Sequence, residues 1–209
     1  MLNFLVILFA ISSIYLSIAE RFRTYSRLIA IQGLLLFGIA FLELKEISTA
    51  NLIFVVTETL IFKAIVVPVI LYNIINRIKV YKVHSKALPG FYSLIFVIFG
   101  LFLSILVANS LKNLHIDNVY LTIALFTLFV GVLLIVTHRL IFSHMIGFLI
   151  IENSVFMFSL AVGTDMPMLI NIGILLDIFV SVMIISVLLN KIGSKFSDLE
   201  SESLTTLKD

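Results

Sequence analysis

Long uninterrupted apolar runs are the feature of this sequence that most limits its fold. Seven can be marked, at 2–19, 27–44, 51–76, 91–111, 118–137, 145–163 and 167–189. A run of about 20 residues crosses the hydrocarbon core of a bilayer as a helix. Because the runs are continuous in Leu, Ile, Phe and Val rather than alternating, they predict helices and not barrel strands. We therefore expect an all-α integral membrane protein with about seven transmembrane helices.

The composition supports this expectation and excludes several classes of site. Of the 209 residues, 61% are hydrophobic and 12% are charged, and the net charge is +2. Soluble domains are about half apolar and a quarter charged. The chain has no cysteine, which removes disulfides, thiolate-held iron–sulfur clusters and Cys-based zinc sites. No basic block interleaved with aromatic residues points to nucleic acid, so we expect the lipid bilayer as its surroundings and no nucleic-acid partner.

The distribution of Lys and Arg predicts the orientation. With the N-terminus outside, the segments on the inside carry eleven of these residues and those on the outside carry two. This asymmetry predicts a cytoplasmic C-terminus. Residues 1–19 lack a basic n-region and are followed, not preceded, by arginines, which favours a retained first helix over a cleaved signal peptide.

The connections between the runs divide the chain into four parts. We expect an N-terminal three-helix segment at 1–77, a cytoplasmic basic loop at 78–90, a C-terminal four-helix segment at 91–190 and a cytoplasmic polar tail at 191–209. No internal repeat is evident. Together with the odd number of spans, this weighs against a stand-alone secondary transporter.

The stretch "TETLIFKAIVVPVILY" places Glu58, Lys63 and Pro68 inside the third span. A charge at mid-bilayer costs about 2.5–3.5 kcal/mol on insertion scales. In a regular α-helix Glu58 and Lys63 would point about 140° apart, so we expect no pair within the helix. Pro68 removes a bond to the carbonyl of Ala64 and predicts a kink. A structural salt bridge to another helix and a role in proton or ion handling both remain open.

Two further acids lie near span centres. Glu152 is central in 145–163, with Asn153 beside it, and Asp177 is near the middle of 167–189. Each could be hydrogen-bonded helix glue or a proton carrier. Only a few residues join these spans, so they are expected to be antiparallel neighbours with their acids at similar depth. That juxtaposition favours a relay.

Other polar residues give weaker signals. Gln32 in the second span is expected to be interhelical glue. His84, His138 and His144 are expected at the inner edge of the membrane and His115 at the outer edge, as wetted surface residues. The sequence contains no phosphate-binding glycine loop, nucleophile elbow or HExxH motif.

The C-terminal half resembles a known family. The stretches "IGFLIIENSVFMFSLAV" and "MPMLINIGILLDIFVSVMIISVLL" resemble hydrogenase-4 component E, a membrane subunit of formate hydrogenlyase-type, group 4 nickel–iron hydrogenase complexes. The shared features are Gly147, the "ENxxF" of 152–156, Pro167 and the "GxLLD" that ends at Asp177. Residues 118–190 are also similar to the K (or 4L) subunit of respiratory complex I and the C subunit of multisubunit sodium/proton antiporters.

The resemblance implies a role for the intramembrane charges. In those families, central carboxylates on consecutive helices belong to the proton path. Glu152 matches the first such position and Asp177 fills the second. Glu58 and Lys63 would extend this polar axis into a proton or ion pathway, and Pro68 would open the third span to water.

The resemblance also implies partners and location. The chain would be a non-catalytic subunit of an oxidoreductase complex in the inner (cytoplasmic) membrane of a prokaryote, with no cofactor or metal of its own. Its partners would be antiporter-like and hydrogenase-anchoring membrane subunits, with peripheral nickel–iron and iron–sulfur subunits. Asn171 stands where the family often carries an acid. The alternatives are an antiporter subunit, a stand-alone secondary transporter, or a scaffold between the modules of a complex.

Overall fold

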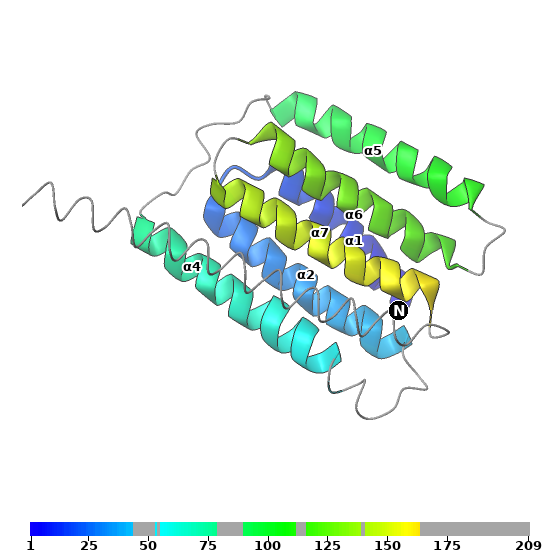
Figure 1. Ribbon diagram of the computed structural model, residues 1–209, viewed down its shortest axis with the longest axis horizontal. Coiled ribbons are helices and arrows are strands. Elements are labelled where there is room, and N and C mark those ends of the chain that lie inside the picture. The colour runs from blue at the N-terminus through cyan, green and yellow to red at the C-terminus, as the bar shows by residue number, and fades with distance from the viewer. Residues whose placement is uncertain (44–52, 54, 79–89, 112–115, 139–140, 164–209) are drawn as a thin grey trace, which may run out of the picture. The chain divides into compact units, whose positions relative to one another are not determined.

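The computed structural model describes residues 1–43, 53, 55–78, 90–111, 116–138 and 141–163. The elements of that part are all helices: α1 (Leu2–Ile18), α2 (Phe22–Glu43), the π-helix η1 (Thr57–Val66), α4 (Val67–Ile78), α5 (Gly90–Ser110), α6 (Asn118–Thr137) and α7 (Ile141–Val162). Figure 1 shows these helices running alongside one another, with η1 continuing directly into α4. The predicted all-α class is confirmed for the described residues.

Four of these helices, α2, α5, α6 and α7, are long and apolar enough to cross a membrane. Helix α1 is apolar but shorter, at 17 residues. These features support a multi-pass membrane protein. The third expected span, 51–76, is not one regular α-helix, because η1 and α4 divide it between them. The seventh expected span, 167–189, lies outside the described residues.

Helices α6 and α7 form a close antiparallel pair around two glycines. A Cβ atom on Gly131 would lie 2.9 Å from the carbonyl oxygen of Gly147, and one on Gly147 would lie 2.9 Å from that of Gly131. Only residues without a side chain allow backbones to approach this closely. At the end of the pair, the Asp117 N–H donates to the Ala161 carbonyl over 2.9 Å and ties the start of α6 to the end of α7.

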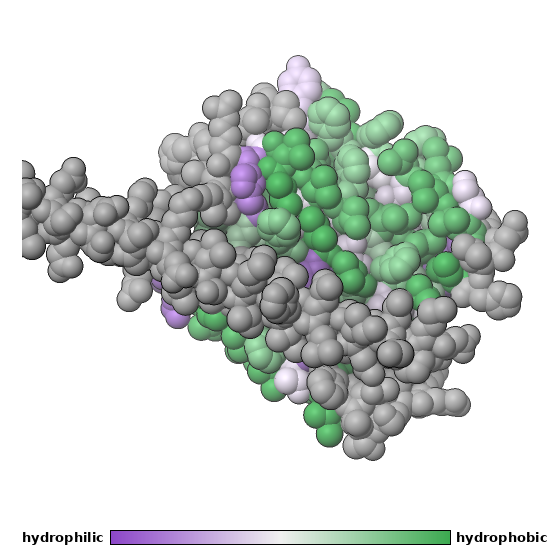
Figure 2. Space-filling view, viewed as in Figure 1, coloured by the Kyte–Doolittle hydropathy of each residue, from purple (hydrophilic) through white to green (hydrophobic). Residues whose placement is uncertain are grey.

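Helix α5 packs on α6 and α1 and exposes the rest of its surface. Its buried side consists of small residues and one valine: Ser93, Val97, Gly100, Ser104 and Ala108. Its other sides expose large apolar side chains such as Phe91, Ile98 and Phe102. Figure 2 shows hydrophobic side chains over much of the described surface on this side. A bilayer is the solvent in which such a surface is stable.

The third span has an unusual backbone. In η1 the hydrogen bonds run between residues five apart, and the Val67 N–H continues this register by donating to the Phe62 carbonyl. π-helices mostly occur as single turns, often at functional sites, whereas this one extends over ten residues. It ends just before Pro68, which has no N–H to donate. In the register set by Val67, the carbonyl opposite Pro68 belongs to Lys63, and not to Ala64 as the α-helical prediction had it.

Candidate intramembrane charge site

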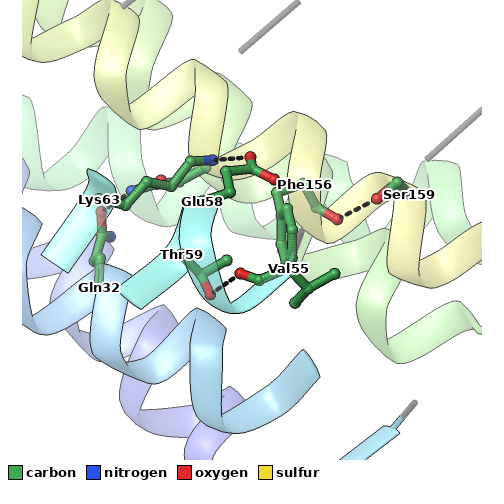
Figure 3. A network of polar contacts seen from close by, with 8 residues as sticks. Gln32, Val55, Glu58, Thr59, Lys63, Phe156 and Ser159 are labelled. Atoms are coloured by element: carbon green, nitrogen blue, oxygen red, sulfur yellow. Dashed lines mark hydrogen bonds and ion pairs between the residues drawn. The ribbon is translucent and has the colours of Figure 1, made fainter. Parts of the chain in front are cut away.

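Glu58 and Lys63 form a buried ion pair within one helix. The Lys63 Nζ atom lies 3.4 Å from Glu58 Oε1, and the two side chains are 7% and 2% exposed; Figure 3 shows the contact. The prediction that these side chains point apart is wrong, because it assumed an α-helix. In a π-helix the backbone N–H of each residue bonds to the carbonyl five positions earlier, so residues five apart lie about one turn apart. The π register therefore places Lys63 on the same face as Glu58.

The pair lies against α7. The Lys63 ammonium is 5.1 Å from the centroid of the Phe156 ring, a cation–π contact between the third span and α7. The Ser159 hydroxyl donates to the Phe156 carbonyl over 2.9 Å (Figure 3). A desolvated cation–π contact contributes up to about 2 kcal/mol. Phe156 thus gives Lys63 a second fixed contact besides Glu58.

Helical spacing places Glu152 on the side of α7 that carries Phe156, the residue that Lys63 contacts. Glu152 and Phe156 are four residues apart, so in an α-helix they share one face. Glu152 is buried, with only 6% of its surface exposed. The structure therefore brings the ion pair of η1 to the side of α7 that carries the predicted carboxyl group.

A chain of buried polar side chains crosses the bundle beside this site. The Asn153 amide donates to Gln32 Oε1 and the Gln32 amide donates to Ser13 Oγ, each over 3.0 Å. Ser13 Oγ is 3.4 Å from Thr127 Oγ1. These contacts link α7, α2, α1 and α6, and they confirm Gln32 as interhelical glue. Sequence reasoning misses Ser13 and Thr127, whose only signal is a hydroxyl within an apolar run.

Helix α2 closes the site from the other side. A Cβ atom on Gly33 would lie 2.7 Å from the backbone carbon of Lys63 and 2.7 Å from the nitrogen of Ala64. The backbone of α2 therefore touches η1 at the level of Lys63. Next to Glu58 in the chain, the buried Thr59 hydroxyl donates to the Val55 carbonyl over 2.6 Å (Figure 3). The charged pair is held between α2 and α7.

The two histidines within the described residues, His138 and His144, lie where α6 ends and α7 begins. His138 is buried, so the expectation of a wetted surface residue is wrong for it. Its Nδ1 atom lies 3.0 Å from both the Leu134 carbonyl and the Thr137 hydroxyl. Both contacts are to the last turn of α6, which His138 directly follows. His144 Nε2 lies 2.7 Å from the His138 carbonyl. The expected edge histidines His84 and His115 lie outside the described residues.

Asp177 also lies outside the described residues, so its predicted approach to Glu152 stays a prediction. Among the residues that the structure describes, no group of three or more His, Cys, Asp or Glu side chains is arranged to hold a metal ion. Comparison of the chain with protein-family models, curated proteins and solved structures found no match. The resemblance to component E therefore also stays a prediction.

Proposed function

We propose that the chain is a non-catalytic membrane subunit of a hydrogenase- or complex I-like redox complex. In this role its intramembrane carboxylates carry protons, or sodium ions, while partner subunits transfer electrons. The observation that carries the transport part is the buried Glu58–Lys63 pair lying against the face of α7 that bears Glu152. The redox part rests on the resemblance of residues 145–190 to component E.

The energetics of the site favour charge transport over simple helix packing. A buried salt bridge adds little net stability, because the desolvation of both charges offsets their attraction. The α6–α7 pair already shows how this chain joins helices without charge, through Gly131 and Gly147. The Glu58–Lys63 pair adds groups that can exchange protons and hold a charge in a low-dielectric interior.

The residues have distinct roles in this proposal. Lys63 stabilises a carboxylate on the pathway, because its ammonium is 3.4 Å from Glu58 and sits on a flexible four-carbon stem. Glu152 passes protons along α7. Asp177, from the span expected at 167–189, continues the path, and Pro68 ends the π register that sets up the pair. The location that goes with this role is the inner membrane of a prokaryote.

Replacing Glu152 tests the transport role. Glu152→Gln keeps the size and most hydrogen bonds of a neutral glutamate but cannot titrate. We expect it to lower redox-driven proton or sodium uptake into vesicles by about a hundredfold, a typical loss for a proton-transferring group. The abundance of the assembled complex should change little. Normal uptake by this variant would contradict the relay role.

A matched control exists at the end of α2. Glu43 accepts a hydrogen bond from the Tyr120 hydroxyl over 2.9 Å, away from the Lys63 site, so Glu43→Gln makes the same change in charge without touching it. Uptake should survive in this control. Asp177→Asn should behave like Glu152→Gln, and the two should be non-additive if they interrupt one path.

Isolation of the native assembly tests the redox part separately. A nickel–iron subunit in the purified complex would support it. A complex made only of antiporter subunits would favour the alternative of a sodium/proton antiporter, which could use the same charge site. A chain that is stable alone and transports a solute by itself would contradict both.

A further inference from the structure

A second polar feature lies at the start of α2, away from the charge site, which meets the middle of this helix at Gly33. Arg21, Arg23 and Arg27 are all exposed there, around the start of the helix. Arg23 and Arg27 are four residues apart and share one face of α2. Since α2 is one of the helices able to cross a membrane, this face meets the headgroup region of one leaflet.

Helix α4 (Val67–Ile78) orients Arg23. The Arg23 guanidinium donates to Asn76 Oδ1 over 3.0 Å, and its central carbon is 5.6 Å from the centroid of the Tyr72 ring. Next to Arg27, the buried Ser26 hydroxyl donates to the Pro68 carbonyl over 2.9 Å. These contacts fix a seam between α2 and α4, with Arg23 and Tyr72 meeting at its exposed edge.

Apolar side chains continue both sides of this seam into the membrane. On α2, Ile31 and Leu34 follow Arg27 at helical spacing and are 47% and 52% exposed. On the third span, Ile65 and Val69 are similarly exposed, at 54% and 51%. The surface is therefore cationic near the start of α2 and apolar further along it. Arg27 lies five residues into the helix, about 7.5 Å from its start, which is within the reach of a snorkelling arginine to a phosphate.

We propose that this α2–α4 seam binds an anionic phospholipid. The headgroup phosphate accepts hydrogen bonds from the guanidinium of Arg27, with Arg23 beside it. The acyl chains lie along the exposed Ile31, Leu34, Ile65 and Val69. The assignment rests on charge complementarity, because a guanidinium fork matches a phosphate, and basic sites between transmembrane helices at a membrane surface recognise anionic headgroups. It does not depend on the transport role.

The test is photo-crosslinking of the full chain in its native complex. The complex is placed in phosphatidylcholine vesicles that contain a small fraction of photoactivatable phosphatidylglycerol. Arg27→Gln should lower labelling of the chain at least about fivefold, because it removes the charge-assisted hydrogen bonds from the guanidinium to the phosphate. Arg27→Lys, which keeps the charge but loses the planar guanidinium fork, should retain only part of it, at a level between Arg27→Gln and the unmodified chain. Arg21→Gln is the matched control, because Arg21 precedes the helix and lies off the Arg23–Arg27 face, and it should change labelling little.

Several results would overturn the proposal. Equal losses with Arg21→Gln and Arg27→Gln would show a diffuse surface charge instead of a site. Unchanged labelling with Arg27→Gln, or equal labelling by photoactivatable phosphatidylcholine, would show no anionic-lipid site. Unchanged labelling combined with loss of a soluble subunit from the complex would show that the arginines bind an acidic protein. If Arg27→Gln does not accumulate, competition by unlabelled phosphatidylglycerol against phosphatidylcholine on the unmodified chain decides the question.

Discussion

Replacing Lys63 by methionine would isolate the buried charge of Glu58. Methionine is unbranched and only one atom shorter than lysine, and it can still pack on the Phe156 ring through its sulfur. What it removes is the ammonium that lies 3.4 Å from Glu58 Oε1. The carboxylate would then remain in a position that is 2% exposed, with its charge partner gone.

The size of the effect follows from this burial. Breaking a buried ion pair by removing one partner typically costs about 3–5 kcal/mol. Removing both charges is far less damaging, because neutral replacements of buried pairs are often harmless. We therefore expect Lys63→Met to destabilise strongly and Glu58→Gln combined with Lys63→Met to recover most of the loss. The interaction energy between the two positions should be about 2–3 kcal/mol.

Denaturant unfolding of the purified complex in lipid discs measures this cycle. The unmodified chain, both single variants and the double variant are compared by their free energies of unfolding, with the amount of chain in membranes as a second reading. Additive losses, with the double variant worse than either single variant, would refute the reasoning. That result would mean that Glu58 and Lys63 do not depend on each other, and that the π register does not serve to pair them.

Two further predictions follow from backbone packing and charge. Gly33→Ala should destabilise the complex by about 1–3 kcal/mol, because its methyl group would meet the backbone of η1 at 2.7 Å. Gly38→Ala in the same helix meets only the flexible end of Leu5 at 3.2 Å and should be nearly neutral in the same unfolding measurement; equal losses would contradict the contact. Reporter fusions after Lys45, Lys86, Lys112 and Lys191 should read outside, inside, outside and inside, and any reversal would show that the predicted topology is wrong.

The helical architecture was accessible from the sequence because lipid imposes a simple rule. An apolar run of sufficient length must satisfy its own backbone hydrogen bonds, and a helix does this locally. Gln32 was predictable for a related reason, since an amide within a span needs a partner on another helix. Its particular partners, Ser13 and Asn153, were not, because they depend on how three separate helices are rotated against each other.

The Glu58–Lys63 pair was missed for a different reason. Reasoning from spacing assumes 3.6 residues per turn, and at that period the two side chains diverge. The π register of η1 changes the helical period over ten residues. Apart from Pro68, which follows η1, no local motif in the sequence indicates this change. His138 shows the same limit, since its position at the end of a span predicts a wetted side chain, whereas it is buried and contacts the Leu134 carbonyl and the Thr137 hydroxyl.

Two adjacent residues of α2 set the depth of the candidate site. Gln32 bonds to Asn153 of α7 over 3.0 Å, and Gly33 lets the backbone of α2 touch η1 at Lys63. Asn153 directly follows Glu152 in α7. Both contacts start from one turn of α2, so they place Lys63 and Asn153, the neighbour of Glu152, against the same turn, although these residues come from distant parts of the sequence. The close approach at Gly33 and the hydrogen bond between Asn153 and Gln32 are therefore required for the site as well as for the packing of the helices. A change at either position should disturb the charge site without altering any of its charged residues.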